Sequence, residues 1–137
     1  MGEYGFDKSY SLVSFVEYCY TKDPVTYAVF EPFLNMSGSA LYDSASFRQV
    51  WKTLAEEEKY TFEADQTIYT YEHYFMPAAT LYTSRFGYDF VNAPDAVKAC
   101  VTSFSIRDGA VTAARYFEGT TSNSTAEDII KTAYGRM

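Results

Sequence analysis

Apolar residues recur at intervals of three and four along nearly the whole chain, and this pattern constrains the fold more than any other feature. The run Leu12, Phe15, Val16 and Cys19, for example, places four apolar side chains on one face of an α-helix. Seven or eight such segments follow one another without an internal repeat, a linker or a low-complexity tract between them. The pattern predicts an all-α fold, organised as one compact domain over residues 1–137.

Caps and helix-breaking residues set the expected boundaries. We expect helices over residues 9–21, 24–33, 45–58, 60–74, 77–86, 92–108, 109–118 and from 124 onward. Residues 35–43 contain Ser37-Gly38-Ser39 and are expected to form a loop. Asp43 or Ser44 is expected to cap the helix that follows this loop.

The second half of the chain carries further boundary signals. Pro77 predicts a helix boundary, because the residue before a proline avoids helical geometry. Gly87 and Gly109 are expected to adopt the left-handed conformation that ends many helices. Ser124 and Glu127 have the spacing of a capping box at the start of the last helix.

Composition supports a packed core and excludes some partners. Apolar residues make up 47% of the chain, and the formal charge is −7. That charge argues against direct binding to nucleic acid and against docking on anionic membranes. The acidic surface has two interpretations: it promotes solubility, or it mimics nucleic acid and occupies a basic cleft on a partner. The acids Glu56, Glu57, Glu58, Glu63 and Asp65 are close in sequence, which fits a protein-binding surface or a solvated helix junction.

The 14 tyrosines and 11 phenylalanines suit the edge of a core, and such rings also line sugar-binding clefts. Cys19 and Cys100 are expected to be buried free thiols. Since His73 is the only histidine, no cluster has zinc-ligand spacing, and we expect neither a metal nor a cofactor. We also expect no signal peptide and no membrane span, because no apolar run reaches about 18 residues.

One helix face carries the first candidate site residues. Phe62, Gln66, Tyr69 and His73 are separated by four, three and four positions, so they are expected to share a face. A histidine on such a face is more often a hydrogen-bonded core residue than a ligand-binding group, and both alternatives stay open. The Gln66 amide could contact sugar hydroxyls or bond a neighbouring backbone group.

Two other segments contain charged candidates. Arg107 complements the negative end of its helix, whereas Asp108 faces that same negative end and is therefore a weak site candidate. Glu3 has the carboxyl group that a general acid needs, but a residue near a chain end is usually hydrated and keeps an ordinary pKa.

Several blocks, taken in order, carry a resemblance to a known family. They are Tyr4-Gly5 with Phe15, Phe47-x-x-Val50-Trp51-x-x-Leu54-Ala55, Phe62-x-x-x-Gln66-x-x-Tyr69-x-x-x-His73-Tyr74-x-x-Pro77, Ala96 to Ala110, and Ala126 to Lys131 with Tyr134. Together they resemble the later part of a phage and prophage peptidoglycan hydrolase family with a lysozyme-like fold. The resemblance implies that Tyr4, Gln66, Tyr69, His73, Arg107 and Asp108 contact a glycan substrate.

The chain also departs from that family. The family's general-acid glutamate lies in a helix before the Tyr-Gly block. In these 137 residues the Tyr4-Gly5 block stands at the very start, so that helix is not among them. A Trp of the family is replaced by Thr102, and its Gln-His-Gly string is replaced by Arg107-Asp108-Gly109. We therefore expect a fragment, a domain completed by another polypeptide, or a relative without hydrolytic activity.

Three functions follow as hypotheses. The first is a peptidoglycan-directed domain that cleaves the glycan strand as a muramidase does, with Glu3 as a weak candidate for the acid. The second is a non-catalytic acidic phage protein that binds and inhibits a basic host protein, as anti-CRISPR and other anti-defence proteins do. The third is a structural part of a phage tail. The expected location is the host bacterial cytoplasm or the virion.

Overall fold

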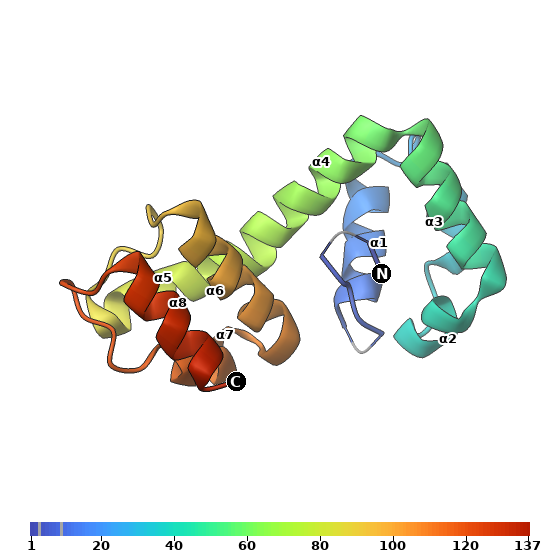
Figure 1. Cartoon of the computed structure of the whole chain (residues 1–137). Coiled ribbons are helices and arrows are strands. Elements are labelled where there is room, and N and C mark those ends of the chain that lie inside the picture. Colours follow the sequence, from blue (N-terminus) through green and yellow to red (C-terminus); the bar gives the residue numbers. More distant parts are fainter. Residues whose placement is uncertain (3, 9) are drawn as a thin grey trace. The chain divides into compact units, whose positions relative to one another are not determined.

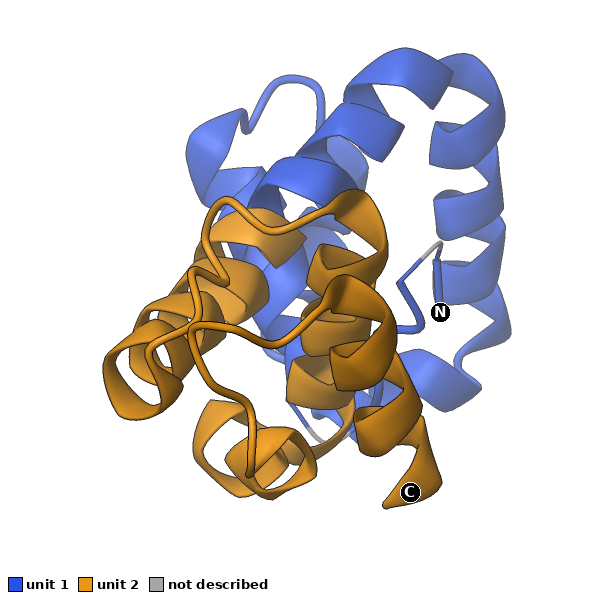
Figure 2. Ribbon diagram, turned by 60° about the vertical axis from the view of Figure 1, so that its left-hand side comes forward, with its two compact units in different colours: residues 1–69 blue, residues 70–137 orange. Residues whose placement is uncertain are grey.

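The computed structural model describes residues 1–2, 4–8 and 10–137. Over these residues the elements are eight α-helices, two 3-10 helices and one π-helical turn, with no strand among them. The predicted all-α fold of seven or eight helices is confirmed. The chain forms two compact units, Met1–Tyr69 and Thr70–Met137, which are coloured separately in Figure 2. The expectation of one domain stays a prediction.

Unit 1 consists of the helices labelled in blue to green in Figure 1. They are α1 (Ser11–Lys22), η1 (Ala28–Phe33), α2 (Gly38–Asp43), α3 (Ala45–Glu57) and α4 (Lys59–Thr70), whose last residue opens unit 2. The predicted apolar face of α1, which includes Phe15, is buried, and α3 buries Phe47, Trp51 and Leu54 but leaves Val50 partly exposed. Helical periodicity therefore located the core of this unit.

Aromatic rings fill that core. Phe6 stacks on Phe15 with ring centroids 4.6 Å apart, and Trp51 meets Phe62 edge to face at 4.8 Å. Tyr69 adds a further edge contact to Phe15 at 5.3 Å. Offset and edge-to-face pairs of this kind add about 0.5–1.5 kcal/mol each beyond the area that they bury. Most of the buried rings thus hold the fold together.

The expected loop over residues 35–43 contains a helix, so that expectation is wrong for its second half. The Oγ atom of Ser37 accepts a hydrogen bond from the backbone N–H of Ala40 and caps α2. Gly38 is the first residue of the helix. A Cβ atom there would lie only 1.8 Å from the carbonyl oxygen of Lys8, so the position requires glycine. The glycine marks a close approach of two backbone segments.

Pro77 was predicted to mark a helix boundary. The helical run instead continues through it, and the type of helix changes just before it. The π-helical turn η2 (Tyr71–Phe75) precedes α5 (Met76–Phe86), and the Met76 N–H bonds the carbonyl of Tyr71. Pro77 has no N–H and occupies the first turn of α5, where that donor is not needed. The π turn accommodates the proline without ending the helical run.

The remaining elements of unit 2 are α6 (Asp95–Asp108), α7 (Ala110–Ala113), η3 (Ala114–Phe117) and α8 (Ala126–Gly135). Helix α6 packs against η2, α7 and α8, and Figure 1 shows α8 alongside it. Val97, Cys100, Val101 and Phe104 form its buried face. Cys19 and Cys100 are both buried free thiols, which confirms that prediction.

Two cap assignments need correction. Gly109 has φ +82° and ψ 153°, so its φ is positive but its conformation is extended instead of left-handed helical. The hydroxyl of Tyr82 donates a 2.7 Å hydrogen bond to the carbonyl of Ala110, directly after this turn. Thr125 is the N-cap of α8 and accepts from the Asp128 N–H, whereas Ser124 accepts from Thr121 within the loop. The predicted capping box was therefore one residue early.

Gly87 behaves as expected, with φ +81° and ψ −5° at the end of α5. Ser44 caps α3 by accepting a hydrogen bond from the backbone N–H of Phe47. Among the helices that the structure describes, none is both long and apolar enough to cross a lipid bilayer.

Candidate functional site

The residues predicted to bind substrate divide between the two units. Tyr4, Gln66 and Tyr69 belong to unit 1, whereas His73, Arg107 and Asp108 belong to unit 2. Glu3, the weak candidate for a general acid, lies outside the described residues.

Gln66 and Tyr69 are core residues of unit 1, with 4% and 1% of their surfaces exposed. A Cβ atom on Gly2 would lie 2.6 Å from Oε1 of Gln66, so the N-terminal segment passes directly over this amide. His73 is exposed, and it does not share the buried face of Phe62, Gln66 and Tyr69. The reason is the π turn that starts at Tyr71, which breaks the spacing of three and four on which the prediction relied.

Tyr4 is half-buried and anchors the N-terminal segment to α4. Its hydroxyl group lies 2.9 Å from the hydroxyl of Thr67. Gly5 follows with φ +65°, a backbone conformation that favours glycine, and it turns the chain so that Phe6 enters the core. The Tyr-Gly block of the sequence thus has a structural part in fixing the start of unit 1.

A buried carboxylate in unit 1 was missed by the sequence reasoning. Asp65 is only 6% exposed. It is therefore not part of the acidic surface that its closeness in sequence to Glu56–Glu58 and Glu63 had suggested. It receives hydrogen bonds from the hydroxyl of Tyr27 at 2.5 Å and from the ammonium group of Lys22 at 2.7 Å. The hydrogen bond to Asp65 raises the pKa of Lys22, and burial raises the pKa of Tyr27. These two partners satisfy the charge of the buried aspartate.

Arg107 and Asp108 form part of a larger group of side chains in unit 2. The guanidinium of Arg107 bonds the Asp108 carboxylate at 3.0 Å and the hydroxyl of Tyr116 at 2.9 Å. Arg115 donates to the same hydroxyl at 2.9 Å. The hydrogen bond from Arg107 lowers the pKa of Asp108, and it raises the pKa of Arg107 itself. Both groups are therefore charged at neutral pH.

Aromatic rings support these charges. Phe104 stacks on Tyr116 with centroids 4.7 Å apart, and the guanidinium carbon of Arg107 lies 5.2 Å from the Phe104 ring. Tyr134 of α8 contacts Phe104 at 5.3 Å and keeps half of its own surface exposed. We name this group the arginine–tyrosine cluster; its members are Phe104, Arg107, Asp108, Arg115, Tyr116 and Tyr134.

The cluster presents two guanidinium groups, one carboxylate and an exposed phenol ring. Cations fixed over aromatic rings are well placed to bind a carboxylate or another planar anion. The exposed ring of Tyr134 offers an apolar surface to a neighbouring part of the same ligand. The arrangement therefore suits a ligand that combines a negative group with a ring.

Sequence reasoning found Arg107 and Asp108 but assigned no binding role to Arg115, Tyr116 or Tyr134. The chain turns at Gly109, and Tyr116 of η3 then meets Phe104 and Arg107 of α6. No periodicity within one helix could have predicted a contact across such a turn.

The chemistry of the cluster is inferred from its own residues. Comparisons with protein-family models, with curated proteins and with solved structures found no match for this chain.

Proposed function

We propose that this chain is a phage-derived, peptidoglycan-directed domain, either a muramidase-type hydrolase of the glycan strand or a remnant of one. The observation that carries the proposal is the arginine–tyrosine cluster. Arg107 and Asp108 come from one of the blocks that resemble the hydrolase family, and Tyr134 comes from another. Two blocks that are distant in sequence thus meet in one exposed group of side chains.

The cluster fits the chemistry of peptidoglycan. Its stem peptides carry carboxylates, which the guanidinium groups of Arg107 and Arg115 can bind. The sugar rings have apolar faces that can pack on the exposed ring of Tyr134. A chain with an overall charge of −7 needs such a local concentration of cations to hold an anionic polymer.

Catalysis by this domain would need a carboxylic acid that remains protonated until it meets the glycosidic oxygen. Asp108 is unsuited to that step, because the hydrogen bond from Arg107 lowers its pKa and keeps it ionised. Its part in the proposal is to orient Arg107. Glu3 stays a weak candidate for the acid, because it has the carboxyl group that this step needs.

Two measurements on the purified 137-residue chain test the proposal. Sedimentation with insoluble peptidoglycan measures binding, and mass analysis of the soluble fraction detects released muropeptides. We expect the double variant Arg107→Gln/Arg115→Gln to bind about tenfold more weakly or worse, since each lost charged hydrogen bond costs about 1.5–3 kcal/mol. Lys52→Gln, which removes an exposed cation from unit 1, is the matched control.

The outcomes separate binding from hydrolysis. Muropeptide release that stops in Glu3→Gln supports an active hydrolase. Binding without release, even after the family's upstream helix has been fused to the chain, supports a remnant. If the unmodified chain does not sediment with peptidoglycan, the proposal is wrong.

A second candidate function rests on the distribution of charge. Unit 1 contains eleven acidic and five basic residues, a formal charge of −6, whereas unit 2 contains seven acidic and six basic residues, a charge of −1. Glu56, Glu57, Glu58 and Glu63 are all exposed. This concentration favours an inhibitor whose unit 1 occupies the basic, nucleic-acid-binding cleft of a host protein.

Competition distinguishes this candidate from the first. An inhibitor of this kind should displace DNA from its target, and the affinity should fall as salt is added. Replacing Glu56, Glu57, Glu58 and Glu63 with Gln should weaken that displacement but leave peptidoglycan sedimentation unchanged. Displacement that survives this replacement would count against the acidic surface.

A further inference from the structure

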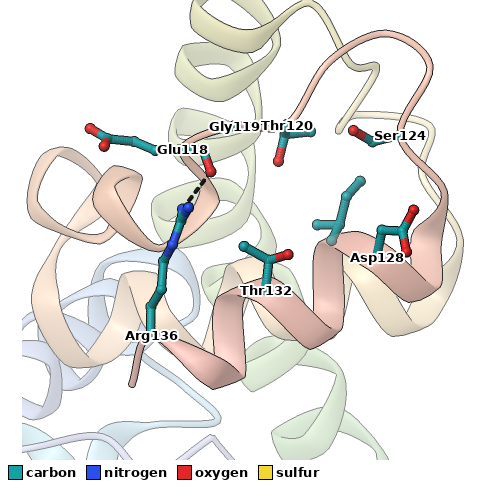
Figure 3. A pocket seen from close by; sticks show the side chains of 8 residues that line it. Glu118, Gly119, Thr120, Ser124, Asp128, Thr132 and Arg136 are labelled. Carbon is teal, nitrogen blue, oxygen red and sulfur yellow. Dashed lines mark hydrogen bonds between the residues drawn. The ribbon is translucent and has the colours of Figure 1, made fainter.

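A pocket of about 310 Å³ lies beside α8, and none of its lining residues belongs to the arginine–tyrosine cluster (Figure 3). Residues of the preceding loop form one wall, and one face of the helix forms the other. Its lining residues are Glu118, Gly119, Thr120, Ser124, Asp128, Ile129, Thr132 and Arg136. The volume is at the lower end of the range for small-molecule sites, so the pocket suits a small ligand.

Polar groups dominate the middle of the pocket. Thr120 and Ser124 project from the loop toward α8, and Thr132 projects from the helix between Asp128 and Arg136 (Figure 3). Thr120 is 9% exposed, and Ile129 is buried. The Ser124 hydroxyl is oriented by the Thr121 N–H, which donates to it at 2.9 Å. The hydroxyl groups can bond the amides or carbonyls of a polar ligand.

Opposite charges occupy the two ends of the pocket. Asp128, Thr132 and Arg136 are spaced by four residues, so they lie along one face of α8. At 1.5 Å per residue, Asp128 and Arg136 are about 12 Å apart along the helix axis. A ligand that contacts both must be extended and must carry a positive group at one end and a negative group at the other.

The two charges differ in how they are held. Over the described part of the chain, no side chain bonds or pairs with the Asp128 carboxylate, which leaves it available to a cation. One terminal nitrogen of Arg136 donates to the backbone carbonyls of Glu118 and Arg115, which fixes the direction of the guanidinium. The other N–H groups of Arg136 remain for an anion. The Glu118 carboxylate points out of the pocket and pairs with Arg85 at 3.1 Å.

We propose that this pocket binds a short peptide with free termini, its ammonium group at Asp128 and its carboxylate at Arg136. An extended chain spans up to about 3.3–3.6 Å per residue, so three residues match the separation of the two charges. The hydroxyls of Thr120, Ser124 and Thr132 then face the amides of the peptide. A saccharide fits less well, because no aromatic ring lines the pocket and a neutral sugar uses neither charge.

Titration of the full chain with trialanine, followed by NMR chemical shifts, tests the proposal. Trialanine should shift the signals of residues around the pocket and should saturate. Asp128→Asn should weaken this binding about tenfold or more, because it removes the charged partner of the ammonium group. The matched control is Glu127→Gln, which removes a neighbouring acid of α8 that does not line the pocket.

Arg136→Gln should weaken binding similarly, with Lys131→Gln as the control for loss of a cation from α8. If Arg136→Gln fails to fold, Asp128→Asn still decides the question, since no described side chain depends on that carboxylate. Equal binding of trialanine with both termini blocked overturns the proposal. The proposal is also wrong if trialanine does not bind at all, or if Asp128→Asn binds it with unchanged affinity. Saturable binding of N-acetylglucosamine in place of the peptide would contradict it as well.

Discussion

The hydroxyl of Tyr27 donates a 2.5 Å hydrogen bond to the carboxylate of Asp65, and this contact joins the segment before η1 to α4 within unit 1. Tyr27 is fully buried and Asp65 almost so. Lys22, at the end of α1, provides the second partner of the carboxylate at 2.7 Å. Three separate elements of unit 1 therefore meet at one buried charge.

Tyr27→Phe should destabilise the protein by about 1.5–3 kcal/mol, because it leaves a buried charged group short of one hydrogen bond. Urea denaturation followed by circular dichroism measures the change in the free energy of unfolding. Tyr60→Phe is the control, since Tyr60 is 83% exposed, and it should change stability by less than about 0.5 kcal/mol. Equal effects of the two variants would contradict the importance of the Tyr27–Asp65 bond.

Neither cysteine should react with a thiol reagent while the protein is folded. Burial raises the pKa of Cys100 to about 11, and it also raises the pKa of Cys19. At pH 8 only about one Cys100 thiol in a thousand is then ionised, and the thiolate is the reactive form. Labelling with a chromogenic disulfide should be slow in buffer and complete in urea. Rapid labelling of either thiol in the native protein would refute its burial.

The Arg107–Asp108 pair should make stability depend on pH in the acid range. The folded-state pKa of Asp108 is lowered from its ordinary value of 3.8, so the folded protein binds this proton less readily than the unfolded chain. The stabilisation is complete above about pH 5 and is lost as the pH falls through 3.8 toward the folded-state pKa. Asp108→Asn should therefore have a Tm that falls less steeply with acid than that of the parent chain. Thermal melts between about pH 5 and pH 2.5 provide the comparison.

Gly38→Ala should destabilise unit 1, because the added Cβ would lie 1.8 Å from the backbone carbonyl of Lys8. Backbone atoms cannot rotate away as a side chain can, so we expect a loss of about 1–3 kcal/mol. Gly135→Ala is the matched control, since that glycine lies in α8 with nothing within 4 Å of the added atom. It should leave the free energy of unfolding unchanged or raise it. A Gly38→Ala variant as stable as the parent would contradict the close approach of the two segments.

Thr125→Ala should cost about 1 kcal/mol, because it removes the acceptor for the Asp128 N–H at the start of α8. Ser124→Ala should cost less, since Ser124 stabilises only the preceding loop. Urea denaturation of both variants ranks the two residues. The reverse order would restore the capping box that the sequence had predicted.

The sequence by itself determined the all-helical class, the positions of α1, α3 and α6, and the buried cysteines. Its spacing of three and four reports which face of a helix is apolar, and that face is buried whatever it packs against. The same spacing failed at His73, because a π turn ahead of Pro77 changes the geometry on which the argument depends.

The tertiary structure decided everything that depends on contacts between helices. Asp65 is an unremarkable acid in sequence, and it is buried only because Tyr27 and Lys22 from other elements satisfy its charge. Arg107 meets Tyr116 after the chain turns at Gly109, and Tyr134 joins them because α8 packs on α6. Local periodicity encodes the face of each helix, whereas the partners of a side chain depend on how distant segments pack together.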